Sequence, residues 1–368
     1  MKHCDKLAVT VNPTNRCNLR CGYCMASSSD EQDNPIVIDI EFAKKGIEDA
    51  IRGYPSGVKV TTLRFFSPGE PTQEMDIVRS CVEHARRLKP DIKTELQTNG
   101  LFETSEDTNW IAKNFDIVWF SLDGPPEIND KNRPDKCGKG RTLEIEKNME
   151  IVGVRTAIGV RSTVEEEIFD KQITLVEYYH NKGIKSLALN PVIYSIPRRD
   201  RGKCSVTKSD IMKFAEGFVQ AYKRADEYGM DLLNSLTFNF DESTNVGCRS
   251  CIPVPQLNPD DSVSSCDMAL YHDTKEELKC FIYGTWNRAK KEVKYYFDRI
   301  EHLGRRRLEN LPVCKNCEIG QYCAGGCAGR IAFQTGDIFD VIPEYCVATK
   351  YLAKNIALVQ KRIKSTHQ

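Results

Sequence analysis

The chain has 368 residues, with 52 basic and 52 acidic side chains and therefore no formal net charge. This balance argues against a polyanion or an anionic membrane as the main partner, because bulk electrostatics would not hold the chain there. Met1–Val11 has no apolar run of signal-peptide length, and no later segment is long enough to cross a bilayer. We therefore expect a cytoplasmic protein that contacts neither nucleic acid nor a membrane.

The first half of the chain alternates short β-branched runs with longer amphipathic stretches. The expected strands are Leu7–Asn12, Val58–Phe66, Ile92–Gln97, Ile117–Leu122, Ala157–Thr163 and Ser186–Ile193, with helices such as Ile40–Ile51, Asp76–Leu88 and Phe169–Asn181 between them. Strands that alternate with helices pair in parallel through right-handed crossovers. Six such units are too few for a closed eight-unit barrel. The sequence therefore predicts an α/β fold, an open (β/α)6 partial barrel of the TIM type over residues 1–207.

The second half of the chain has a different sequence pattern. A basic, proline-bearing loop, Ser195–Lys203, ends the barrel, and a long helix over Lys208–Tyr228 follows within a linking segment, 208–233. Later segments are short and rich in Gly, Pro and Cys, with little periodicity. We therefore expect residues 234–346 to form a small cysteine-rich domain organised by its ligands rather than by an apolar core. A last helix is expected within 347–368.

Cysteine is the residue type that stands out. Sixteen cysteines without a secretory signal are not expected to form a disulfide framework, because the cytosol keeps thiols reduced. Cys17, Cys21 and Cys24 follow the first strand with three and two residues between them, which places them at the edge where α/β barrels carry their chemistry. Three thiolates on a four-iron cluster leave one iron without a protein ligand, as reactive metal centres do. A zinc site lacking its fourth ligand is the alternative.

At these three cysteines the sequence resembles the radical S-adenosylmethionine (SAM) superfamily, whose defining motif has the same spacing. The resemblance implies a [4Fe–4S] cluster that chelates SAM and cleaves it to a 5′-deoxyadenosyl radical, which abstracts hydrogen from the substrate. Further matches follow at successive strand ends, namely Ser67-Pro68-Gly69-Glu70-Pro71, Gln97-Thr98-Asn99-Gly100, Ser121-Leu122-Asp123-Gly124 and Asn132-Arg133. Pro68 departs from the family's Gly-Gly-Glu-Pro segment, which leaves the backbone there in doubt but keeps Gly69 and Glu70.

The resemblance also implies a set of SAM contacts. Tyr23 would contact the adenine, Gly69 and Glu70 the methionine ammonium, Ser121 the ribose and Arg133 the methionine carboxylate, and Ile193 at the end of the sixth strand would complete the set. Each of these residues alone has an ordinary structural explanation, such as a turn, a surface acid or a loop cation. Their order at successive strand ends is what favours cofactor binding.

Eight more cysteines lie in the second half: Cys248, Cys251, Cys266, Cys314, Cys317, Cys323, Cys327 and Cys346. Their pattern resembles the SPASM domain, an accessory module with two further four-iron clusters in many peptide-modifying radical SAM enzymes. The resemblance assigns Cys248, Cys251, Cys266 and Cys327 to the nearer cluster, and Cys314, Cys317, Cys323 and Cys346 to the distal one. The chain would then hold three [4Fe–4S] clusters. A zinc ribbon is the alternative, since a two-residue spacing is also typical of zinc sites.

Two positions depart from the accessory-domain pattern. Asp261 stands where the family usually has Gly, five residues before Cys266; Asp tolerates turn conformations that favour Gly, so the hairpin is expected to survive. Cys248 is separated from Cys251 by only two residues, where sulfatase-maturing relatives have a longer gap. Without Cys248 as a ligand, the nearer cluster would have an open iron able to touch substrate.

The expected reaction is net oxidation, because fully ligated clusters provide a route for the electron of a substrate radical. Such a reaction also needs a base, and Asp267 is the candidate catalytic residue. It directly follows Cys266, where anaerobic sulfatase-maturing enzymes place a catalytic aspartate; a turn-capping or solvent-facing carboxylate is the alternative. The resemblance implies oxidation or crosslinking of a peptide or protein side chain, with a flavodoxin- or ferredoxin-type reductant.

Two other functions stay open. Cys327-Ala328-Gly329-Arg330 followed by Thr335-Gly336-Asp337 is similar to the ending of radical SAM enzymes that oxidise or decarboxylate small molecules or tetrapyrrole precursors. A non-catalytic iron–sulfur electron-transfer protein or a zinc-binding protein is the alternative of another class. The first cysteine motif begins at residue 17, so no fused leader-binding domain is expected; substrate would be recognised directly or by a separate protein.

Overall fold

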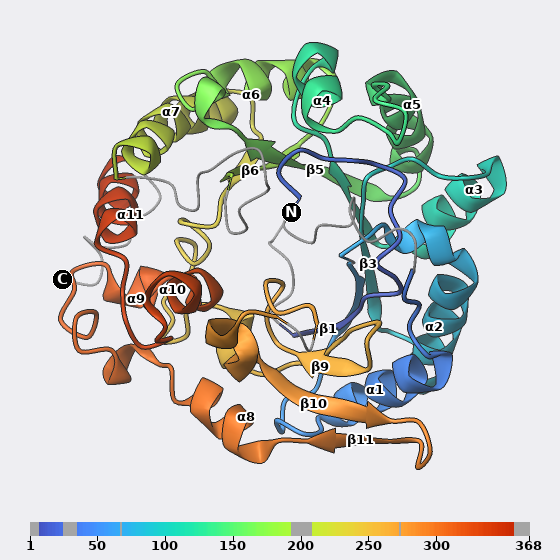
Figure 1. The fold of residues 1–368 in the computed structure, drawn as a ribbon. Helices are drawn as coiled ribbons and strands as arrows, with labels where there is room; N and C mark the ends of the chain where they lie inside the picture. Colours follow the sequence, from blue (N-terminus) through green and yellow to red (C-terminus); the bar gives the residue numbers. More distant parts are fainter. Residues whose placement is uncertain (1–6, 25–34, 67, 193–207, 272–273, 357–368) are drawn as a thin grey trace.

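The structure, a computed structural model, describes residues 7–24, 35–66, 68–192, 208–271 and 274–356. In these residues, eleven strands form one sheet in the order β11-β10-β9-β8-β1-β2-β3-β4-β5-β6-β7. The parallel part consists of β1 (Ala8–Val11), β2 (Thr62–Phe65), β3 (Lys93–Thr98), β4 (Ile117–Ser121), β5 (Ala157–Val164), β6 (Ser186–Pro191) and β7 (Asp231–Leu233). Figure 1 shows these strands curving around the centre of the molecule with helices along the outer rim. The predicted α/β partial barrel is confirmed.

The helices of the barrel follow the predicted alternation. They are α1 (Ile40–Arg52), a 3-10 turn η1 (Pro71–Glu74), α2 (Met75–Leu88), α3 (Ser105–Asn114), α4 (Pro126–Asn132), α5 (Thr142–Gly153), η2 (Glu166–Ile168), α6 (Gln172–Asn181) and α7 (Lys208–Glu227). Local chemistry sets several ends: the Asp39 side chain accepts from the amide of Glu41 at the start of α1. The apolar stripe of α2 is buried, and Cys81 on it is a core residue.

The linking segment differs from its prediction. The helix predicted over Lys208–Tyr228 ends at Glu227, because Gly229 adopts a φ of 64°, a conformation that favours glycine. The amide of Met230 then bonds back to the carbonyl of Ala225. The chain turns into β7, which pairs in parallel with β6. A strand of three residues is too short to show periodicity, so the sequence did not reveal this seventh parallel strand.

The second half continues the barrel sheet. Its strands are β8 (Gln256–Leu257), β9 (Ser262–Ser264), β10 (Ile282–Asn287) and β11 (Glu292–Tyr295), and β8 pairs in parallel with β1. Between and after them lie η3 (Arg249–Cys251), η4 (Glu276–Phe281), α8 (Phe297–Gly304), η5 (Leu308–Asn310), α9 (Gly320–Cys323), α10 (Ala328–Thr335) and α11 (Pro343–Asn355). The predicted divisions at 207, 233 and 346 stay predictions.

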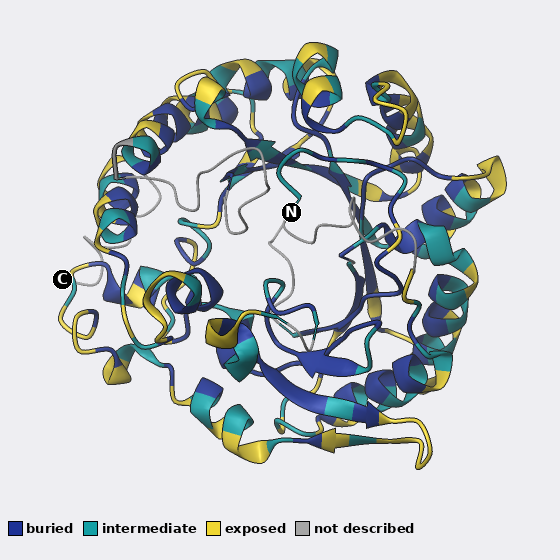
Figure 2. Cartoon of the chain, viewed as in Figure 1, coloured by how far each residue is buried: buried dark blue, intermediate teal, exposed yellow. Residues whose placement is uncertain are grey.

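An apolar core runs through both halves, contrary to the expectation for the second one. Buried side chains such as Val263, Phe281, Tyr283 and Trp286 belong to the same core cluster as the barrel. Figure 2 shows the buried residues facing inward all around the ring and the exposed residues on its outer rim. Ligands are therefore not the only organising force in this half.

The hairpin at Asp261 survives, as expected. Asp261 has a φ of 69°, and the amide of Asn258 bonds across the turn to the carbonyl of Ser262. Arg288 holds the Asp261 carboxylate with two hydrogen bonds, of 2.6 and 3.0 Å. This ion pair compensates for a backbone conformation that side chains rarely adopt.

The last helix begins earlier than predicted. Helix α11 starts at Pro343, a favoured first helical residue, so Cys346 lies inside the helix. It packs against α7 on the barrel rim. Among the described helices, none combines the length and apolarity needed to cross a bilayer.

Helix α7 also packs closely against the backbone at Phe169, just after η2, and this contact can be tested. A Cβ on Gly217 would lie 1.9 Å from the carbonyl oxygen of Phe169. That carbonyl already accepts from Gln172 and belongs to rigid backbone. We expect Gly217→Ala to lower the free energy of unfolding by about 1–3 kcal/mol, as measured by urea denaturation.

Gly304→Ala is the matched control, because a Cβ there meets nothing within 4 Å. It should leave stability within about 1 kcal/mol of the parent. Equal effects of the two substitutions would contradict the packing assignment.

Candidate active site at the barrel mouth

A cavity of about 630 Å³ lies between the two halves of the chain. The carboxyl ends of the parallel strands line it, as expected for an α/β barrel. Its lining includes Gln97, Ser121, Arg161, Thr163 and Asn190 from those ends. Ten of the eleven predicted cysteine ligands also line it, all except the buried Cys251. The structure thus brings the residues at the strand ends and the predicted cysteine ligands to one cavity.

The first cysteine loop is fastened to the exit of β2. The amide of Gly69 donates to the carbonyl of Thr14 (3.3 Å), and the amide of Glu70 donates to that of Arg16 (2.7 Å). A Cβ on Gly69 would lie 2.1 Å from the Arg16 carbonyl oxygen, so only glycine allows this approach. Pro68 therefore does not prevent the backbone at Gly69 and Glu70 from bonding to the first cysteine loop.

Burial controls the chemistry of these thiols. Desolvation raises the pKa of Cys17 to about 11 and that of Cys21 to about 12. The amide of Leu19 lies 3.4 Å from the Cys17 sulfur and favours its thiolate. Buried thiolates need positive charge beside them, and a metal cluster that replaces the thiol protons supplies it.

Glu70 holds the strand ends together. Its Oε1 accepts from the amide and hydroxyl of Thr72 and from the Thr98 hydroxyl, at 2.8 to 3.1 Å. Its Oε2 accepts from the Asn99 amide at 2.6 Å. Burial nevertheless raises the pKa of this carboxyl. The residue predicted to contact the methionine ammonium therefore also ties the exit of β2 to that of β3.

Tyr23, Asp123 and Arg133 form a buried chain of hydrogen bonds. The Tyr23 hydroxyl donates to Asp123 (2.6 Å), and Arg133 donates to the Tyr23 oxygen (2.7 Å). Asp123 also accepts from the amide of Thr163 (2.9 Å), an anchoring role that the sequence did not reveal. Among the described residues, nothing accepts from the buried Nε of Arg133. That donor fits a carboxylate such as the one predicted for SAM.

Two further SAM contacts were predicted. Ser121 ends β4 and lines the cavity. Ile193 lies outside the described residues.

The eight remaining cysteines fall into two groups in space. Cys248 and Cys251 are joined by a hydrogen bond, and Cys266 is influenced electrostatically by Cys248 and Cys327. Burial raises the pKa of Cys323 to about 12, with Cys346, Cys314 and Cys317 adding to the rise. The ligand sets of the two clusters stay predictions. In the described part of the chain, no three His, Cys, Asp or Glu side chains are arranged to hold a single metal ion.

Gly329 and Arg306 lie beside the sulfurs of the nearer group of cysteines. A Cβ on Gly329 would lie 2.6 Å from the Cys266 sulfur. The guanidinium of Arg306 is fully buried and lies 4.0 Å from the Cys251 sulfur. The hydrogen bond from Cys251, together with the charge of Arg306, lowers the pKa of Cys248.

Asp267 is held by two arginines rather than by a turn. Its Oδ1 accepts from Arg64 (2.9 Å) and from Arg249. Although desolvation opposes the charged form, Arg249, Arg64 and Arg161 hold the pKa of Asp267 well below its usual range. The Asp267 side chain is still 40% exposed and lines the cavity. The sequence analysis did not identify Arg64; a cation inside an apolar strand is the signal that could have found it.

Comparison with known proteins decides the family. The profile of the Radical SAM superfamily matches residues 11–195. The chain belongs to the radical SAM superfamily. Like its relatives, this radical SAM enzyme is expected to use SAM and a [4Fe–4S] cluster, which AdoMet-bound solved structures of the same fold also support.

Relatives of this radical SAM enzyme include peptide-modifying enzymes. It is 24% identical over 345 residues to the cysteine-type anaerobic sulfatase-maturating enzyme of Clostridium perfringens, covering 87% of this chain and 88% of that protein. It is also 30% identical over 194 residues to the uncharacterized protein MJ0907 of Methanocaldococcus jannaschii, covering 52% of this chain and 62% of that protein.

Two solved structures share the fold. Native anSMEcpe with bound AdoMet and Kp18Cys peptide has a TM-score of 0.71 and 18% identity, covering 98% of each chain. Streptococcus suis SuiB bound to precursor peptide SuiA has a TM-score of 0.62 and 17% identity, covering 89% of this chain and 73% of that one. At these identities the likeness establishes the fold.

Gly69→Ala tests the fastening of the first cysteine loop. The added methyl group would displace the Arg16 carbonyl and with it the backbone that carries Cys17. We expect the reconstituted variant to lose about four irons per chain while keeping its far-UV circular dichroism spectrum. Iron analysis and Mössbauer spectroscopy measure this loss, and Gly304→Ala should retain the full iron content.

Proposed function

We propose that this enzyme oxidises a side chain of a peptide or protein, as in sulfatase maturation or peptide crosslinking, and that two auxiliary clusters take up an electron. One observation carries the proposal. A single cavity is lined by the Cys17 loop, by both further cysteine groups and by Asp267. A substrate bound there would lie within reach of a radical source, an electron route and a proton acceptor.

The first part of the site would hold the cluster and SAM. Cys17, Cys21 and Cys24 would ligate the cluster, and Arg133 and Ser121 would bind the cofactor. When bound, these groups supply the 5′-deoxyadenosyl radical that abstracts hydrogen. The roles of the surrounding residues follow from their contacts: Gly69 and Glu70 position the cysteine loop, and Asp123 orients Tyr23 and Arg133.

Arg306 supports a cluster at the nearer group of cysteines. Its guanidinium donates to the carbonyls of Ile338 and Gly325, and among the described residues no carboxylate pairs with it. An isolated buried charge is costly unless an opposite charge lies close by. As cluster ligands, Cys248 and Cys251 would be the nearby thiolates, which also supports Cys248 as a ligand. A net-negative cluster at Cys248, Cys251, Cys266 and Cys327 would balance this cation.

Removing that charge should change the potential of the cluster. We expect Arg306→Gln to make the potential of one auxiliary cluster more negative, because the cation favours the reduced, more negative state. Arg306→Lys should restore most of the difference. Redox titration followed by electron paramagnetic resonance measures both, with iron content as the check on folding. Equal potentials in the parent and both variants would refute this role of Arg306.

Asp267 would accept a proton from the substrate. Both arginines bind its Oδ1, and in the described part of the chain nothing donates to its Oδ2. The low pKa keeps the group a carboxylate, the form that accepts a proton, and at the same time makes it a weak base while both arginines bind it. Arg64 and Arg249 are positioning residues, since they also donate to Thr10 and so tie Asp267 to β1.

The substrate class is proposed from the cavity and the relatives. A cavity of about 630 Å³ is of the size that holds small ligands or a few side chains. The solved structures of anSMEcpe and SuiB named above contain peptides. A flavodoxin- or ferredoxin-type protein is the proposed reductant.

The function is tested with anaerobically reconstituted enzyme, SAM, dithionite and a panel of Cys- and Ser-containing peptides. We expect 5′-deoxyadenosine together with a peptide that has lost two hydrogen atoms, both detected by mass spectrometry. Asp267→Asn should still cleave SAM but form the oxidised peptide at least about 100-fold more slowly.

Asp91→Asn is the control, because Asp91 is an exposed partner of Lys89 outside the cavity lining. It should oxidise peptide at the parental rate. Oxidation of a free small molecule with no peptide in the panel modified would reject the proposed function. Parental oxidation by Asp267→Asn would reject only the proton acceptor.

A further inference from the structure

Arg330 on α10 is a buried cation that no role assigned so far explains. It is 3% exposed and lines the cavity. Its guanidinium lies over the ring of Tyr345, 4.4 Å from the ring centroid. In the described part of the chain, its buried Nε has no acceptor and no carboxylate pairs with the group. Stacking covers a face of the guanidinium but leaves its in-plane donors free.

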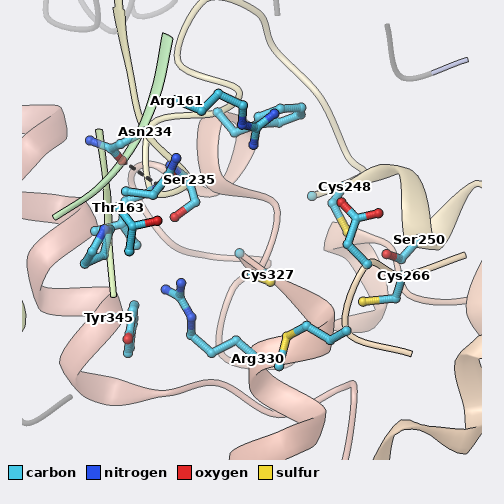
Figure 3. A pocket seen from close by; sticks show the side chains of 18 of the residues that line it. Arg161, Thr163, Asn234, Ser235, Cys248, Ser250, Cys266, Cys327, Arg330 and Tyr345 are labelled. Carbon is cyan, nitrogen blue, oxygen red and sulfur yellow. Dashed lines mark hydrogen bonds between the residues drawn. The ribbon is translucent and has the colours of Figure 1, made fainter. Parts of the chain in front are cut away.

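A second unpartnered donor lines the same cavity. The Nδ2 of Asn234 is buried and has no acceptor among the described residues. Its Oδ1 is used by the amides of Leu236 (2.7 Å) and Thr237 (3.1 Å), which fixes the amide orientation. Figure 3 shows the Arg330 guanidinium directed toward Thr163 and Ser235, with Asn234 on that side of the cavity. In the described residues, this wall thus carries two buried donors, Arg330 Nε and Asn234 Nδ2, that have no acceptor.

The charged side chains that line the cavity also favour an anionic ligand. Six cationic side chains line it, namely Arg64, Arg133, Arg161, Arg249, Arg330 and Lys350, against the carboxylates of Glu70 and Asp267. Glu70 is enclosed by its own donors, and Asp267 is held by two of the arginines. Among the side chains that line the cavity, the cations therefore outnumber the carboxylates.

Arg330 is not among the groups that shift the pKa of Cys17, Cys21, Cys248, Cys251 or Cys266. The cation with the largest influence on Cys248 and Cys251 is Arg306, and on Cys17 and Cys21 it is Arg133. Arg330 instead faces Tyr345. A guanidinium and an amide together match a singly charged planar anion, and a carboxylate fits the fork of an arginine with two parallel hydrogen bonds.

We propose that Arg330, assisted by Asn234, binds a carboxylate of the peptide substrate, either an acidic side chain or the C-terminal carboxylate. That the ligand is a peptide rests on the proposed function. The contact would select peptides with an acidic group at a set distance from the modified residue. Arg330 would then determine specificity at the wall formed by β5, β7 and α10.

The test uses reconstituted enzyme with SAM under anaerobic conditions and fluorescein-labelled Cys-containing peptides. In one series a Glu or a Gln is moved along the peptide, and in the other the C-terminus is a free acid or an amide. Fluorescence anisotropy measures the Kd. For the parent we expect the acid at the right position to bind about 10- to 100-fold more tightly than its neutral partner. The series that shows the difference identifies the source of the carboxylate.

Arg330→Gln should abolish this preference while its iron content and auxiliary-cluster potentials stay parental. Arg330→Lys should keep a smaller preference. Lys350→Gln, which removes another cation of the cavity lining, should leave it unchanged. A parent without acid preference, an absence of peptide binding, or a preference that survives Arg330→Gln would each overturn the inference.

Turnover separates this inference from the proposed function. Peptides that bind through their carboxylate but are never oxidised would reject the proposed function and keep the carboxylate site. Peptides that are oxidised equally well with and without the carboxylate would reject the site alone. A shift of cluster potential in Arg330→Gln, with the acid preference intact, would assign Arg330 to the cluster instead.

Discussion

The pairing of β1 with β8 is the interaction on which the site depends. Strand β1 has β2 on one side and β8 on the other, so it joins the barrel to the second half within one sheet. The Thr10 hydroxyl on β1 accepts from Arg64 and from Arg249, and these arginines come from the two halves and meet again at Asp267. Because the Cys17 loop leaves from the end of β1, the same strand sets where that loop faces the second half.

Buried charge is the second constraint on this site. The N-terminal thiols have raised pKa values because burial opposes their thiolates, whereas Arg306 and Arg330 are buried cations without a carboxylate partner in the described residues. Buried charges without partners are destabilising in isolation. The thiols of Cys17 and Cys21 and the guanidinium of Arg330 line one cavity, so groups of opposite charge brought by cofactors and substrate would stabilise both. Sites that carry such uncompensated groups are where function is expected.

The sequence predicted what depends on local pattern and spacing. The six barrel strands appear as β-branched runs, and Asp261 occupies the turn that its residue type allows. The division of the eight later cysteines into two sets came only from the resemblance to the SPASM domain. It did not predict β7 or the continuation of the sheet through β8, because strands of two or three residues carry no periodic signal. Nor did it reveal Arg64, Arg249 and Arg306, since single arginines in a sequence usually indicate solvated surface. Only tertiary packing shows that these three are enclosed.

The continuity of the sheet also limits how far the two halves are separate units. Strand β8 has only two residues, and its edge toward β1 would be unpaired without the barrel. An exposed strand edge is unfavourable and prone to aggregation. The Asn12 side chain donates to Asn258 inside this junction (2.7 Å), and a buried polar contact of this kind is lost if either half moves away. The distance between the Cys17 loop and the cysteines of the second half is therefore set by strand pairing rather than by a linker, and a molecule bound in the cavity between them would meet both in one fixed arrangement.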